Sequence, residues 1–74
     1  MTKLFNKIAI IVENNLYENK TVILDSFKLR FTKKSVIVYS IDKTDGSWFK
    51  ETTINAEMYS HQIVNLIIQI IKFN

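Results

Sequence analysis

The 74-residue chain contains no cysteine and no proline, and it has only one glycine, one histidine and one arginine. Without cysteine it can form neither disulfide bonds nor thiolate metal sites. Its single glycine, Gly46, excludes the glycine-rich loops that bind phosphate groups. With one histidine, His61, a zinc site would need several carboxylates as further ligands, which is uncommon. The sequence therefore predicts no metal site and no cofactor.

Long apolar runs are also missing. The run Ile8–Val12 is too short for the core of a signal peptide. The C-terminal apolar stretch, residues 63–73, is interrupted by Asn65, Gln69 and Lys72 and is too short and too polar to span a bilayer. We therefore expect a cytoplasmic protein, in the host cytoplasm if a phage encodes it, with no association with membranes.

The composition is that of a small folded domain. Hydrophobic residues make up 47% of the chain and aromatic residues 12%, which favours a packed core over disorder and predicts a single domain over residues 1–74. The formal net charge is only +3, and nine of the ten basic residues are lysine. Isoleucine, lysine and asparagine together supply 28 of the 74 residues, which indicates an AT-rich genome such as that of a low-GC bacterium or its phages.

The spacing of apolar residues predicts five elements. Residues 3–17 place their apolar side chains on one arc of a helix. Residues 21–31, 35–41 and 47–54 alternate with period two and predict three strands. Residues 56–73 predict a second helix whose apolar arc covers about half of its circumference, more than the roughly 100° of a helix buried on one side.

This order predicts a two-layer α+β fold of the type α-β-β-β-α, with a three-stranded antiparallel meander and both helices packed on one face. A tight turn after Phe31 pairs this residue with Val36 and places Lys28 beside Tyr39. The Asp-Gly turn within residues 42–46 joins the second and third strands. Its length is ambiguous, so the register of the third strand stays open.

No motif of a known catalytic mechanism is present, so we expect a protein that is not an enzyme and has no catalytic residues. His61 follows Glu57 by four residues on the polar side of the last helix, which predicts a surface pair. Asn55 is the expected N-cap of that helix. Asp42 and Asp45 are explained by the conformation of the turn in which they lie.

Basic and aromatic residues alternate along the predicted hairpins. A solvated face that prevents aggregation explains such lysines in many sheets. The same pattern suits a docking surface for a protein, formed by Lys28, Arg30, Tyr39, Trp48 and Phe49. It also suits single-stranded nucleic acid, with phosphate contacts from Lys28, Arg30, Lys33, Lys34 and Lys50.

Two isoleucines fall outside the apolar arcs of their helices, Ile10 in the first helix and Ile68 in the last. They indicate more apolar surface than one small core needs. An isologous homodimer through the last helix would cover it. The residues expected at that interface are Ile63, Ile67, Ile68 and Ile71.

The length and element order are similar to those of the double-stranded RNA-binding domain. That family carries a lysine cluster at the start of its last helix, where this chain reads Asn-Ala-Glu-Met-Tyr-Ser over residues 55–60. It also carries a histidine in the loop after its first strand, where residues 32–35 read Thr-Lys-Lys-Ser. The phosphate-binding residues are absent, so the resemblance implies a fold and no function. Small inhibitors made by phages of low-GC bacteria resemble this chain in their compact, motif-free αβ layout.

From these features we expect a small non-enzymatic regulator or inhibitor, from a phage or mobile element of an AT-rich bacterium, that docks onto a larger host protein. The alternatives are a nucleic-acid-binding module that uses the same basic and aromatic sheet face, and a small virion or assembly protein.

Overall fold

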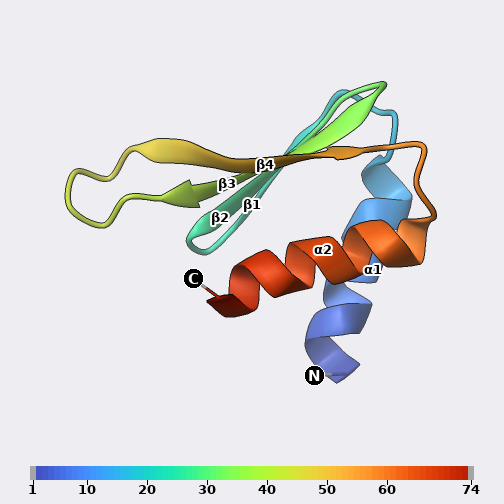
Figure 1. Cartoon of the computed structure of the whole chain (residues 1–74), viewed down its shortest axis with the longest axis horizontal. Helices are drawn as coiled ribbons and strands as arrows, with labels where there is room; N and C mark the ends of the chain where they lie inside the picture. The colour runs from blue at the N-terminus through green and yellow to red at the C-terminus, as the bar shows by residue number, and fades with distance from the viewer. Residues whose placement is uncertain (1, 74) are drawn as a thin grey trace.

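The computed structural model describes residues 2–73, which form a two-layer α+β fold with two helices on one face of a single antiparallel sheet (Figure 1). The predicted fold class is confirmed, but the sheet has four strands where three were predicted. This additional strand also separates the chain from the element order of the double-stranded RNA-binding domain. The elements are α1 (Thr2–Asn15), β1 (Thr21–Leu24), β2 (Phe27–Phe31), β3 (Ser35–Ile41), β4 (Trp48–Asn55) and α2 (Ser60–Phe73).

Neighbouring strands of the sheet follow one another in the chain, in the order β1-β2-β3-β4. The predicted register between β2 and β3 is confirmed, because Phe31 pairs with Val36 and Lys28 pairs with Tyr39. The register that the sequence left open pairs Ser35 with Asn55 at one end of the β3–β4 ladder and Ile41 with Trp48 at the other.

The additional strand arises because residues 21–31 form a hairpin and not one strand. Asp25 and Ser26 make a two-residue turn, and Asp25 has a left-handed backbone with φ of 51°. The turn changes which residues face inward, so Val22 pairs with Leu29 on the core side. Ile23 therefore lies on the other face, 62% exposed, although continuous alternation had placed it with the core.

Asp25 is expected to tolerate asparagine but not valine. A β-branched side chain is strained at positive φ, so Asp25→Val should cost about 1–3 kcal/mol of unfolding free energy. Asp25→Asn is the matched control, since asparagine adopts this conformation readily and the change removes the same charge. Urea denaturation followed by Trp48 fluorescence measures both variants. Equal stability of the two would contradict the assignment of the turn.

The β3–β4 turn is held by its aspartates, as the sequence predicted. Asp42 Oδ1 accepts a hydrogen bond from the backbone N–H of Thr44 at 2.8 Å. Asp45 Oδ1 accepts bonds from the backbone N–H and the hydroxyl of Ser47 at 2.9 and 2.7 Å. These two bonds, that from the backbone first, lower the pKa of the Asp45 carboxyl below its ordinary value. Gly46 supplies the left-handed residue, with φ of 75°.

A β-bulge interrupts the β3–β4 ladder. Its extra residue is Glu51, which lies between the partners of Val38 and Tyr39. The Glu51 carboxylate accepts a hydrogen bond of 2.7 Å from the hydroxyl of Ser40. Because Ser40 is buried on the helix-facing side of the sheet, this bond satisfies a hydroxyl that would otherwise lose its hydrogen bonds to water.

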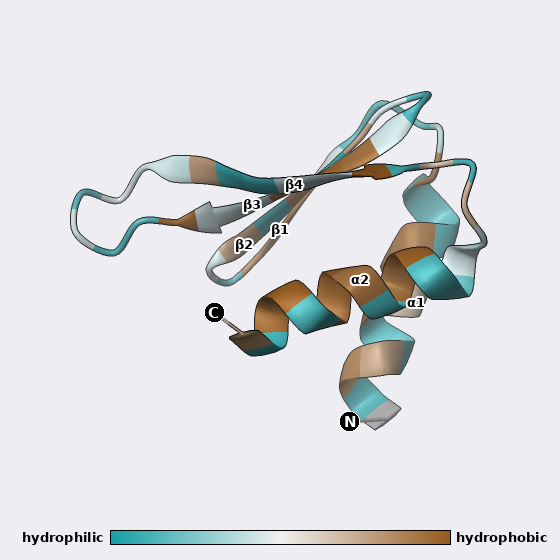
Figure 2. Cartoon of the chain, in the orientation of Figure 1, coloured by the Kyte–Doolittle hydropathy of each residue, from teal (hydrophilic) through white to brown (hydrophobic). Residues whose placement is uncertain are grey.

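The core lies between the sheet and the two helices, where the apolar sides of α1 and α2 meet (Figure 2). It joins inward-facing strand residues to side chains from both helices. Its buried members are Ile8, Val12, Leu29, Phe31, Val36, Val38, Ile54, Ile63, Val64, Ile67 and Ile68.

The predicted start of the last helix was too early. Asn55 forms a turn before the helix, in which its Oδ1 accepts the backbone N–H of Glu57 at 2.8 Å, and α2 begins at Ser60. Glu57 is therefore outside the helix, and the predicted helical pair between Glu57 and His61 is wrong. The His61 ring instead stacks on Tyr59, with centroids 5.8 Å apart and an angle of 12° between the planes.

The isoleucines assigned to a dimer interface lie inside the chain's own fold. Ile63, Ile67 and Ile68 are buried in the core, and Ile71 is half-buried against it. The apolar arc of α2 is wide because this helix packs against both α1 and the sheet. Ile10 is exposed on α1, as its position outside the apolar arc predicted.

Candidate binding surface on the uncovered sheet face

The face of the sheet opposite the helices presents a row of side chains across all four strands. Directly paired residues of an antiparallel sheet lie on the same face. The pairings therefore align Ile23, Lys28, Tyr39 and Lys50 in one row. The next row includes Arg30 and Ile37.

At the centre of this face, the ammonium group of Lys28 lies between two aromatic rings. Its Nζ is 4.6 Å from the centroid of the Tyr39 ring and 4.9 Å from that of Trp48. Both distances are within the range of a cation–π interaction. All three side chains are half-buried, so the two rings and the ammonium group hold one another in place. Arg30 lines an open depression together with these three side chains. We call Lys28, Arg30, Tyr39 and Trp48 the basic–aromatic cluster.

The charged strand residues on the uncovered face of the sheet are all positive. Lys28, Arg30 and Lys50 contribute positive charge, and no strand residue on this side between residues 2 and 73 is acidic. Glu51 lies in the bulge and bonds to Ser40 on the opposite side. An open depression of about 510 Å³ adjoins the cluster, with Asn19, Thr21 and Thr32 among the residues that line it. The surface therefore combines positive charge, aromatic rings and hydrogen-bonding groups.

The structure brings together most of the residues that the sequence had selected. Four of the five predicted docking residues form the basic–aromatic cluster, with Lys50 adjacent to Tyr39. Phe49 does not belong to it, because its pairing with Ser40 places it on the helix side of the sheet, where it is 45% exposed. Lys33 and Lys34 lie exposed in the turn between β2 and β3.

Sequence reasoning missed one apolar residue of this surface. Ile23 borders the cluster through its pairing with Lys28. The signal that could have placed it there is the turn at Asp25 and Ser26, since a two-residue turn reverses the alternation of the strand that follows.

Within residues 2–73, no group of three or more histidine or acidic side chains could hold a metal ion. No helix in this range is long and apolar enough to cross a membrane. Comparisons with protein-family models, with curated proteins and with solved structures found no match to this chain.

Proposed function

We propose that the chain is a non-enzymatic binding protein that docks the uncovered face of its sheet onto an acidic surface of a larger protein. In this role it would act as a regulator or inhibitor. The observation that carries the proposal is the basic–aromatic cluster, in which Lys28 fixes the Tyr39 and Trp48 rings at the centre of a face without acidic strand residues. Tryptophan, tyrosine and arginine are the residues that most often dominate binding energy at protein interfaces.

The composition of the surface supports a protein partner. Ile23 and Ile37 add apolar area beside the cluster, and aromatic anchors with apolar neighbours are typical of the centre of an interface. The positive charge favours an acidic partner and would accelerate its association. The isoleucine- and asparagine-rich composition supports an origin in a phage or mobile element of an AT-rich bacterium.

Single-stranded nucleic acid is the second candidate, favoured by the lysines that surround the cluster. Lys33 and Lys34 extend the positive surface beyond Arg30 into the adjoining turn. The contact between Lys28 and both rings weighs against it, because bases would have to compete with the ammonium group for the ring faces.

Trp48→Ala is expected to weaken partner binding by about 2 kcal/mol or more, roughly 30-fold in Kd, because it removes an anchor of the interface. Its matched control is Phe49→Ala, which removes a neighbouring aromatic ring from the opposite face of the sheet. The immobilised wild-type chain and both variants would be used to capture proteins from a low-GC bacterial lysate. We expect one acidic protein to bind the wild type and Phe49→Ala but not Trp48→Ala.

The same preparations test the second candidate. A labelled single-stranded oligonucleotide is titrated at low and at physiological salt, with fluorescence anisotropy as the measurement. Phosphate contacts with single strands would lower log K by about 0.7 per contact for each unit of log salt concentration. Steep, salt-sensitive binding that Lys33→Gln and Lys34→Gln flatten would replace the protein proposal with a nucleic-acid one. A partner retained equally by Trp48→Ala and Phe49→Ala would rule out the cluster as the docking surface.

A further inference from the structure

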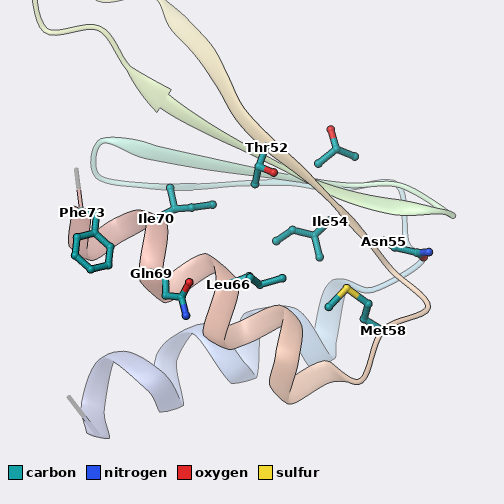
Figure 3. Close-up of a pocket in the computed structure, with 9 residues that line it drawn as sticks. Thr52, Ile54, Asn55, Met58, Leu66, Gln69, Ile70 and Phe73 are labelled. Carbon is teal, nitrogen blue, oxygen red and sulfur yellow. The ribbon is translucent and has the colours of Figure 1, made fainter.

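The free edge of β4 and the adjacent side of α2 enclose an apolar groove (Figure 3). The groove has a volume of about 450 Å³ and no charged residue lines it. Phe73, at the end of α2, is 86% exposed there, and Leu66 is partly exposed. The residues that line it are Thr52, Thr53, Ile54, Asn55, Met58, Leu66, Gln69, Ile70 and Phe73.

The backbone of β4 directs hydrogen-bonding groups toward this groove. The N–H of Ala56 donates to the carbonyl of Lys34 at 3.0 Å, so these two residues form a hydrogen-bonded pair of the β3–β4 ladder. In an antiparallel ladder, hydrogen-bonded pairs alternate with pairs that are not bonded to each other. Ile54 therefore bonds to β3, whereas the N–H and C=O groups of Thr53 and the N–H of Asn55 face the free edge. The C=O of Asn55 instead accepts the backbone N–H of Met58 at 3.2 Å. An edge of this kind is a template for another strand.

Only half of this edge carries the features that usually prevent pairing. The first half of β4 has the charged Lys50 and the bulge at Glu51. Charges and bulges are common protections of sheet edges. The second half, residues 52–55, has neither.

We infer that a second copy of this chain pairs with the second half of β4. A two-fold axis at Thr53 places this residue opposite its own copy, where the outward N–H and C=O groups form a hydrogen-bonded pair. The same axis places Thr52 opposite Ile54 of the second copy. The axis also places Asn55 opposite Glu51 of the second copy, at the bulge, and no like charges face each other in this register. The interface is thus self-complementary, as a two-fold dimer requires.

The helices fit the same arrangement. Strands lie about 4.8 Å apart and packed helices about 8–10 Å apart, so one helix covers about two strands. Four strands with two helices would therefore continue into eight strands with four helices, and the two copies of α2 would meet beside the joined edges. This contact would cover Leu66 and Phe73, which are the exposed apolar residues of the groove.

The available surface indicates a weak dimer. A small specific interface buries roughly 600 Å² on each partner. For this chain, with an accessible surface of 4987 Å², that is about an eighth of the total. The proposed contact uses a four-residue strand edge and one side of a 14-residue helix, so we assign it to this small size class. Sedimentation equilibrium should therefore span protein concentrations from roughly 10 µM to 1 mM.

We expect the wild-type chain to reach twice its 8.7 kDa mass in this range. Thr53→Lys should raise the dimer dissociation constant about fivefold or more, because two ammonium groups would face each other at the axis. Thr53→Glu should do the same, whereas an equimolar mixture of the two variants should dimerise again. Thr21→Lys is the matched control, because Thr21 is an exposed threonine on the same face of the opposite edge strand.

Three outcomes would overturn this dimer. They are a wild-type chain that stays monomeric up to about 1 mM, a dimer that Thr53→Lys leaves intact, and an assembly larger than two copies. Restoration of dimers by the Lys and Glu mixture would support the axis at Thr53 directly. Sedimentation tests the dimer separately from the proposed function. Trp48→Ala, which tests the proposed docking surface, changes the uncovered sheet face and leaves residues 52–55 of the β4 edge in place.

Discussion

Phe31→Ala is expected to cost about 3–5 kcal/mol of unfolding free energy. Phe31 is 1% exposed and is among the largest fully buried side chains of the core. Its removal leaves a cavity between the sheet and the helices, which the surrounding side chains can fill only in part. A domain of 74 residues has a total stability of about 4–11 kcal/mol. The variant should therefore lose a large part of that stability.

Phe49→Ala provides the comparison for this loss. The side chain removed is the same, but Phe49 keeps 45% of its surface exposed and does not belong to the buried core. We expect a loss of less than about 1.5 kcal/mol, in proportion to the smaller area withdrawn from water. Urea denaturation followed by the fluorescence of Trp48, the single tryptophan, measures both variants. Similar losses for the two would contradict the placement of the core.

Ile67→Ala is expected to have the second-largest effect, about 2–5 kcal/mol. Ile67 is fully buried within a single chain, although the sequence pattern had assigned it to an interface between two chains. A residue of the core destabilises the monomer when it is shortened, so the loss should be the same at low and at high protein concentration. A residue of an interface would instead give a loss that depends on concentration.

Leu66→Ala is the control on the neighbouring position of the same helix. Leu66 is 36% exposed at the groove, so its truncation should cost clearly less than that of Ile67 at concentrations where the chain is monomeric. Thermal unfolding at two protein concentrations a hundredfold apart would separate these effects. A concentration-dependent loss for Ile67→Ala would move this residue from the core to an interface.

The register of β2 and β3 could be predicted because two independent signals agreed. Alternating apolar residues, such as Leu29 and Phe31 against Val36 and Val38, show which side chains of β2 and β3 face the core and which face away from it. The short connection after Phe31 then allows only one alignment of β2 with β3. The position of Lys28 beside Tyr39 follows from this register, so half of the cation–π cluster was visible in the sequence.

The missed elements have local causes. The turn at Asp25 and Ser26 contains no glycine, although Asp25 adopts the left-handed conformation with φ of 51°. The sequence predicts Asn55 as an N-cap, whereas its side-chain oxygen closes a turn before the helix with the same type of bond, accepted from a backbone N–H. Sequence alone does not distinguish these two uses of asparagine.

The remaining part of the binding surface depends on contacts between distant residues. Trp48 reaches Lys28 only because β4 is aligned with β3 through a six-residue turn and a bulge at Glu51. The bulge shifts the alternation of β4 by one residue, which places Trp48 on the uncovered face and Phe49 on the helix side. Neither the turn length nor the bulge has a sequence signal strong enough to fix this register.

The order of the strands has a consequence for the rate of folding. Each strand pairs with its neighbour in the chain, through connections of two, three and six residues. Closing such short loops costs little conformational entropy, so each hairpin can form before the chain ends meet. The packing of α1 against α2 brings residues from opposite ends of the sequence together. A low average sequence separation between contacting residues correlates with fast folding. We therefore expect the hairpins of the sheet to form first and the contact between the two helices, which is distant in sequence, to form last.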